Sequence, residues 1–259
     1  MLLIDASGAT WVDYEESSTY AATLPSGLGS FGELSGGISV PAGDGRYFVV
    51  GGTRRSEASR AVLEVAADGT LTAHTTAIAR KGAAALWIDG VGLVVTGGSA
   101  EAPGVEVLAD GATAFAARGF PADPVEGAAA VTDGGKGVGL IGGTSGGAAA
   151  PTRLLDPTCV ATCTAKELPE ATPKDVTLAT VAAYAFEGTN ILVVGDEADG
   201  MKLTRSFMVN LTGGVTELPL KEPRRGAIAV PTPLASLAIL GGELPDGKPA
   251  TTVEMFFTH

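Results

Sequence analysis

The feature that most constrains this chain is an apolar run that ends on a glycine and occurs five times. In the first copy, residues 46–52 read RYFVVGG, and a polar loop and a second apolar run follow. The turn glycine recurs at Gly51, Gly97, Gly142, Gly195 and Gly241, so successive copies are spaced by roughly 45 to 53 residues. Repeats of this length that hold several short strands are typical of β-propeller blades.

Composition agrees with short strands and tight turns rather than helices. The 259 residues include 37 glycines and only 18% charged residues, and alanine and valine are abundant. Each repeat reads as four strands, the first rich in small residues and the second continuously apolar, as a strand packed on both faces would be. We therefore expect an all-β chain forming a single propeller domain over residues 1–259, with five four-stranded blades at residues 36–79, 80–125, 126–175, 176–222 and 223–259.

The two ends of the chain bear on how such a ring would close. MLLID at the start resembles a third strand of the repeat, and the last copy ends at a third strand with no fourth. Residues 1–35 are therefore expected to supply a strand that completes the last blade and removes both free edges. The alternative is that these residues belong to a sixth blade.

The repeats resemble kelch-type propellers, the superfamily that includes galactose-oxidase-like propellers. The resemblance covers about residues 36–259 and rests on glycine pairs after apolar runs, on strand openings of the Arg-x-Gly-Ala type at residues 80–83 and 225–227, and on Val-Glu third strands at 105–106 and 253–254. The structural glycines that it assigns are Gly51, Gly52, Gly97, Gly98, Gly142, Gly143, Gly195, Gly241 and Gly242. The aromatic-poor, alanine-rich copies resemble divergent bacterial kelch-like proteins of the cell envelope. The family implies the fold and only weakly a function.

Charge and hydropathy exclude two classes of partner. A formal net charge of −12 without a basic stripe opposes binding to nucleic acid. No apolar run approaches the roughly 18 residues that a membrane-spanning helix needs, so no membrane insertion is expected.

The two cysteines, Cys159 and Cys163, lie four positions apart in the repeat with the longest spacing. A pair this close in a turn favours a small disulfide loop, with free thiols as the alternative. A disulfide would indicate a periplasmic, cell-surface or secreted location, since such bonds persist in oxidising compartments.

Loops that follow the glycine turns differ in length and charge while their flanks repeat, which is typical of a binding surface on a regular scaffold. Together with the linkers between blades, they are expected to form one rim. The candidate binding residues there are Arg54, Arg55, Glu57, Glu101, Asp196, Glu197, Asp199, Lys202, Arg224, Arg225, Asp246 and Lys248. We also hypothesise that the pairs Arg54-Arg55 and Arg224-Arg225 form an acceptor for carboxylate or phosphate groups; local salt bridges are the alternative.

The sequence contains few residues that are suited to catalysis. The chain has two histidines, and the apolar inner strands carry no ionisable residue, so we expect no enzyme activity, no cofactor and no metal site. The sequence favours a non-catalytic interaction or scaffold propeller with a protein partner. The alternative is a carbohydrate-binding or carbohydrate-acting propeller, which would need exposed aromatic platforms; Trp11, Trp87 and Tyr184 are expected to be mostly interior.

Overall fold

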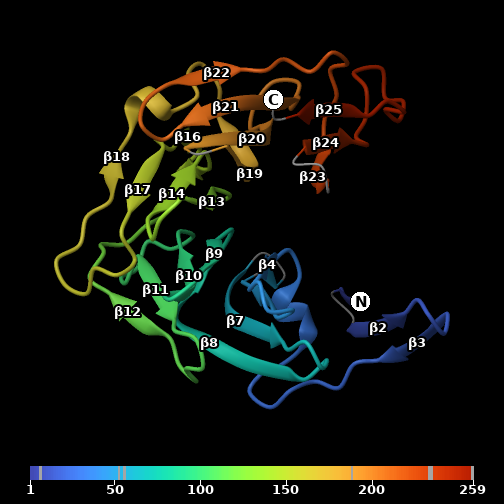
Figure 1. Cartoon of the computed structure of the whole chain (residues 1–259), viewed down its shortest axis with the longest axis vertical. Coiled ribbons are helices and arrows are strands. Elements are labelled where there is room, and N and C mark those ends of the chain that lie inside the picture. The colour runs from blue at the N-terminus through green and yellow to red at the C-terminus, as the bar shows by residue number, and fades with distance from the viewer. Residues whose placement is uncertain (6–7, 52, 55–56, 188, 233–235, 258–259) are drawn as a thin grey trace. The chain divides into compact units, whose positions relative to one another are not determined.

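The computed structural model of the chain is all-β, with strands joined by tight turns and two short 3-10 helices (Figure 1). It describes residues 1–259 except 6–7, 52, 55–56, 188, 233–235 and 258–259. The chain divides into two compact units. Unit 1 comprises Met1–Pro124 and Pro157–Cys163, and unit 2 comprises Val125–Asp156 and Thr164–His259.

Unit 1 contains three antiparallel sheets. The first has the order β1-β2-β3, the second β4-β5-β7 with β6 and β8 also paired to β7, and the third β12-β11-β10-β9. The elements are β1 (Leu2–Ile4), β2 (Ala9–Asp13), β3 (Ser18–Ala21), η1 (Phe31–Leu34), β4 (Ile38–Pro41), β5 (Tyr47–Val50), β6 (Thr53–Arg54), β7 (Glu57–Val65), β8 (Leu71–Arg80), β9 (Ala84–Ile88), β10 (Gly92–Thr96), β11 (Val105–Leu108) and β12 (Ala116–Arg118).

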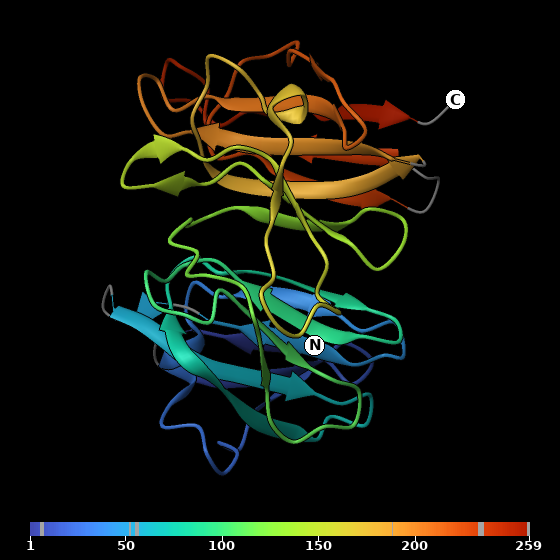
Figure 2. The ribbon, with the colours of Figure 1, turned by 90° about the vertical axis from the view of Figure 1, so that its left-hand side faces the viewer.

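Unit 2 also contains three larger sheets, with the orders β13-β14-β17-β18, β19-β20-β21-β22 and β23-β24-β25, and a small β15-β16 hairpin. Figure 2 shows its larger sheets stacked face to face. The elements are β13 (Ala129–Thr132), β14 (Val138–Ile141), β15 (Thr144–Ser145), β16 (Ala148–Ala149), β17 (Arg153–Leu155), β18 (Lys166–Glu167), η2 (Pro169–Ala171), β19 (Leu178–Glu187), β20 (Asn190–Glu197), β21 (Thr204–Asn210), β22 (Val215–Glu217), β23 (Ile228–Thr232), β24 (Ser236–Leu240) and β25 (Glu254–Phe257).

The hydrophobic core of each unit lies between neighbouring sheets. In unit 1, Phe48 of β5 stacks on Trp87 of β9, with ring centroids 5.6 Å apart. In unit 2, Ile141 of β14 and Ile191 of β20 belong to one cluster between the sheets of β13 and β19. Every residue of β10 and of β14 is buried, which confirms that the continuous apolar runs pack on both faces.

The chain has a β-propeller arrangement of six blades, three in each unit, so the expectation of five is corrected and the alternative of six holds. The sixth blade is the N-terminal sheet. Leu2–Ile4 pairs with Ala9–Asp13 in a sheet of its own instead of completing the last blade, which has three strands among the described residues. The strand of residues 2–4 was recognised but assigned to the last blade, because its apolar run ends on Asp5 without the turn glycine that marks the other blades.

A disulfide joins Cys159 and Cys163, as the spacing predicted, with Cα atoms 5.9 Å apart. The loop that it closes belongs to unit 1, where the Gly119 amide donates to the Val160 carbonyl and the Cys163 amide donates to the Gly119 carbonyl. A Cβ atom on Gly119 would lie 2.7 Å from the Ala161 Cα, so glycine is required for this close approach. No helix in the described part of the chain is long and apolar enough to cross a bilayer.

Candidate functional site

The turn between β20 and β21 and the linker between β22 and β23 meet on one side of unit 2. Asp196, at the end of β20, makes this junction. Its Oδ1 accepts a hydrogen bond from the Thr204 hydroxyl at 2.6 Å and another from the Gly226 amide at 3.2 Å. The Thr204 hydroxyl oxygen also accepts from the Ala227 amide at 3.2 Å. One carboxylate therefore fixes the loop against the linker.

These segments surround a cavity of about 440 Å³, which we call the rim hollow. The hollow is lined by Ala179, Thr180, Asp196, Glu197, Ala198, Lys202, Arg225, Gly226 and Glu243. A second hollow, of about 510 Å³, shares Glu197 and is lined by Ala149, Pro173, Asp175, Val176, Thr177, Glu197, Asp199 and Gly200. The structure thus brings together five predicted rim residues, namely Asp196, Glu197, Asp199, Lys202 and Arg225.

The charged groups of the rim hollow differ in how firmly they are held. Arg225 pairs with Glu243 through its side chain, and the two backbones exchange hydrogen bonds of 2.9 Å in both directions. Glu197 pairs with Arg205 at 2.5 Å. Lys202 is exposed and has no ion-pair partner among the described residues. The hollow therefore offers a partner one free ammonium beside carboxylates whose positions are already fixed.

The predicted rim residue Arg224 does not reach this surface. Its side chain is fully buried, and its guanidinium donates to the Thr252 carbonyl at 2.8 Å and pairs with Glu222 at 3.0 Å and Glu254 at 3.3 Å. Neighbouring residues of an extended segment point in opposite directions, so burial of Arg224 turns Arg225 outward. Arg224 is a structural residue in this fold, and the predicted anion acceptor cannot use it.

The remaining predicted residues are scattered. Glu57 begins β7 and Glu101 follows β10, both exposed in unit 1. Asp246 and Lys248 lie in the loop between β24 and β25 and pair with each other at 2.8 Å. Arg55 and Gly52 lie outside the described residues, and only the backbone of Arg54, in β6, is described.

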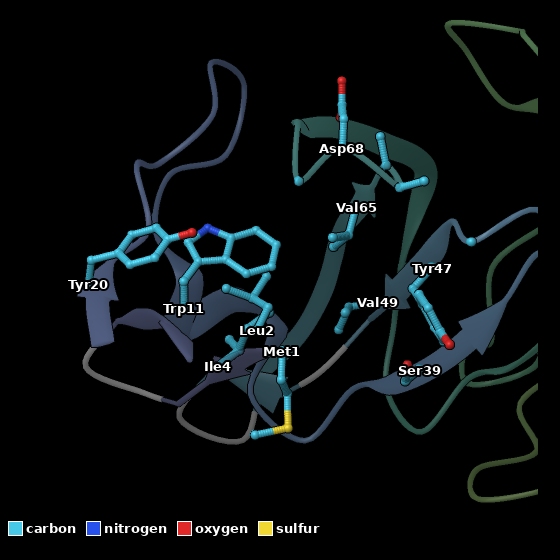
Figure 3. Close-up of a pocket in the computed structure, with 14 residues that line it drawn as sticks. Met1, Leu2, Ile4, Trp11, Tyr20, Ser39, Tyr47, Val49, Val65 and Asp68 are labelled. Carbon is cyan, nitrogen blue, oxygen red and sulfur yellow. The ribbon is translucent and has the colours of Figure 1, made fainter. Parts of the chain in front are cut away.

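A third cavity, of about 640 Å³, lies in unit 1 between the N-terminal sheet and the sheet of β4 to β8 (Figure 3). We call it the aromatic cavity. Trp11 and Tyr20 form one wall, with ring centroids 6.5 Å apart and an interplanar angle of 28°, and Tyr47 stands on the opposite side. Its lining residues are Met1, Leu2, Ile4, Trp11, Tyr20, Ser39, Gly45, Tyr47, Val49, Val65, Ala66, Ala67, Asp68 and Gly69.

Sequence reasoning did not assign any residue of the aromatic cavity to a site. Trp11 was expected to be mostly interior, and it is half-buried at the cavity wall. Tyr20 and Tyr47 were not singled out because they lie in different sheets, and no local motif links them. The other two aromatic residues considered are also half-buried: Trp87 stacks on Phe48, and the Tyr184 hydroxyl donates to the Ala229 carbonyl at 2.6 Å.

Among the described residues, no group of three or more histidine, cysteine, aspartate or glutamate side chains is arranged to hold a metal ion. The arrangement of the sheets defines the class of this protein as a six-bladed β-propeller. It carries loop-lined hollows in unit 2 and an aromatic cavity in unit 1.

No protein family model matches the sequence, and no curated protein matches it. Among solved structures, the chain is similar to hydrazine synthase of Kuenenia stuttgartiensis, with a TM-score of 0.57 and 16% sequence identity. The similarity covers 85% of this chain and 60% of that chain, so this protein spans less than two thirds of the length of its structural neighbour. At this level of identity the likeness supports the propeller fold.

Proposed function

We propose that this chain is a non-catalytic, kelch-type interaction propeller that binds a protein partner through the rim hollow, outside the cytoplasm. The observation that carries the proposal is the convergence of loop and linker residues on one hollow. Variable loops held on a rigid scaffold are where binding surfaces are usually built, and here Asp196 fixes two such segments together.

The charges of the rim hollow indicate the chemistry of the partner. Asp196, Glu197 and Glu243 contribute carboxylates, whereas Lys202 and Arg225 contribute cations. Complementary charge patterns give specificity and fast association rather than affinity alone. We expect a partner surface that carries both a carboxylate, to meet Lys202, and a basic group, to meet the acidic wall.

The disulfide supports the proposed location. Cys159 and Cys163 form a closed pair, and structural disulfides persist where the environment is oxidising.

The kelch assignment rests on the glycine pairs and on the buried Arg224–Glu254 contact within a repeated Arg-x-Gly-Ala and Val-Glu pattern.

The test compares two variants with the same change of charge. Lys202→Glu/Arg225→Glu reverses the cations of the rim hollow, and Lys136→Glu/Lys166→Glu reverses two exposed lysines of unit 2 that lie outside both hollows. Each immobilised protein is incubated with extract of the native host, with and without reductant. Retained proteins are then quantified by mass spectrometry, and the partner is purified and titrated.

A partner of the rim hollow is retained by the wild type and the control variant, and its affinity for the rim variant falls at least about tenfold. If every retained protein binds the rim variant as well as the control, the rim hollow is not the binding site. If the purified protein turns over a substrate of the host, the non-catalytic part of the proposal fails.

A further inference from the structure

The aromatic cavity of unit 1 combines an apolar floor with polar groups at its edges. Leu2, Ile4, Val49 and Val65 form the floor between the two sheets (Figure 3). Its volume of about 640 Å³ falls in the range of roughly 300 to 1,000 Å³ that small-ligand sites occupy. Cavities lined by apolar and aromatic side chains with a few placed polar groups are the usual form of such sites.

The Trp11 ring of this cavity is packed against protein groups, whereas the rings of Tyr20 and Tyr47 are partly exposed to solvent. The Trp11 ring is fixed between Tyr20, which stacks on it, and the β7–β8 turn, where a Cβ atom on Gly69 would lie 3.7 Å from Trp11 Cζ2. Tyr20 and Tyr47 are 58% and 49% exposed, values that leave about half of each ring available to a ligand. Within the described part of the chain, no hydrogen bond engages either tyrosine hydroxyl.

Polar groups next to the rings decide which ligand fits. Asp68 and Ser39 line the same cavity as the two tyrosines. The Asp68 carboxylate accepts a hydrogen bond from the Thr70 amide at 2.9 Å, and this contact lowers the Asp68 pKa, so the group is an ionised acceptor at neutral pH. A wholly apolar ligand would cover these polar groups without replacing their hydrogen bonds to water, which is costly.

We propose that the aromatic cavity binds a neutral sugar ring, as part of an oligosaccharide. A pyranose presents C–H faces that can stack on Trp11 or Tyr20, and the next sugar unit can stack on Tyr47 across the cavity (Figure 3). Sugar hydroxyl groups can accept from the tyrosine hydroxyls and, at the outer edge of the cavity, donate to Asp68. The net charge of −12 and the carboxylate of Asp68 disfavour uronic acids and sulfated sugars.

The site is independent of the rim hollow. Its residues belong to unit 1, and the residues of the rim hollow belong to unit 2. Sugar binding can therefore fail while protein binding through the rim hollow holds, and the reverse is also true.

The experiment uses tryptophan fluorescence, because the chain has only two tryptophans. A Trp87→Phe variant keeps an aromatic ring against Phe48 and leaves Trp11 as the single reporter. It is titrated with neutral hexasaccharides of glucose, xylose, mannose and N-acetylglucosamine, and with hexagalacturonate as an anionic comparison. Affinities are checked by calorimetry on the unmodified chain.

We expect at least one neutral hexasaccharide to change Trp11 emission with a Kd below about 1 mM, and hexagalacturonate to have no effect. Tyr20→Ala and Tyr47→Ala should each weaken binding roughly three- to tenfold, and Asp68→Asn about tenfold. Phe257→Ala is the matched control, since Phe257 is an aromatic residue of unit 2 that is 55% exposed and does not line the cavity. Its affinity should equal that of the reporter variant.

Three outcomes would overturn the proposal: no neutral hexasaccharide binds up to ~10 mM, hexagalacturonate binds as well as the neutral sugars, or binding is unchanged in Tyr20→Ala and Tyr47→Ala. Circular dichroism and thermal unfolding of each variant distinguish a lost contact from a lost fold.

Discussion

Replacing Glu106 by leucine while Arg80 stays in place is expected to destabilise unit 1 by about 3 to 5 kcal/mol. Both side chains are 1% exposed, and Arg80 Nη2 lies 3.0 Å from Glu106 Oε2. Removing the carboxylate leaves a guanidinium buried without its counter-charge. Glu106 Oε1 also accepts from the Ala77 amide at 2.5 Å, so that donor would lose its partner as well.

The double replacement Arg80→Leu/Glu106→Leu should cost less than the two single replacements together. In the preceding repeat the corresponding residues are Leu34, the last residue of η1, and Leu63 of β7, which are 2% and 0% exposed and belong to one apolar cluster. Leu63 pairs with Val49, two residues before Gly51, just as Glu106 pairs with Val95, two residues before Gly97. The chain itself thus contains an apolar version of this pair.

The double variant is still not neutral. Arg80 donates to the carbonyls of Gly97 at 2.9 Å, Pro103 at 2.8 Å and Gly104 at 3.3 Å, and leucine cannot replace these hydrogen bonds. An acceptor left without a partner costs about 1 to 3 kcal/mol. We therefore expect a coupling energy between the two sites of about 2 kcal/mol, in the direction that favours the double variant.

The assay is urea unfolding of the wild type, the two single variants and the double variant, followed by the emission of Trp87, which lies in the same blade. If the free energies of the single variants add to that of the double variant, the ion pair is not an energetic unit. If Glu106→Leu costs less than about 1 kcal/mol, the backbone carbonyls alone hold Arg80 and the reasoning is refuted.

Three further predictions follow from the structure. Cys159→Ala/Cys163→Ala should lower the free energy of unfolding by about 2 kcal/mol because the closed loop is short, and thermal unfolding with reductant should shift the wild type alone. Gly119→Ala should cost about 1 to 3 kcal/mol, measured by urea unfolding, because its Cβ would meet the disulfide loop; an unchanged midpoint would contradict the close approach. Sugar binding should stay constant from pH 7 to pH 5 and weaken only below about pH 4. The hydrogen bonds from Thr70 lower the Asp68 pKa, so this carboxylate stays ionised until the pH falls through that lowered pKa. Calorimetric titration across this range measures the affinity, and a loss of affinity above about pH 5 would contradict the prediction.

The strands of five blades could be predicted because each apolar run is followed by a glycine, and in four of the five that glycine turns the chain. Gly51, Gly97, Gly142 and Gly241 adopt φ values from 62° to 74°, a region that glycine enters without strain. Gly195 departs from this pattern, because β20 continues through it to Glu197. A glycine followed by Asp196 thus marks an extended strand rather than a turn.

The two arginines of the last linker show where sequence reasoning was insufficient. Adjacent residues Arg224 and Arg225 look equivalent in the sequence, yet one is fully buried and the other lines the rim hollow. A signal did exist: Arg80 and Arg224 each precede a glycine by two positions, and the third strands of their two repeats each contain a glutamate, Glu106 and Glu254. Reading that pattern as a buried pair requires knowing that both positions face inward.

The buried arginine is also what makes the rim hollow possible. Arg224 donates to Thr252 and pairs with Glu254, and Glu254 in turn accepts from the amides of Lys221 and Glu222 at 2.7 and 3.1 Å. The linker is therefore fixed immediately before Arg225, whose backbone then pairs with Glu243. A charged group on a fixed backbone loses less conformational entropy on binding than one on a mobile loop. The same interactions that stabilise the last blade thus preorganise the surface that we propose for the partner.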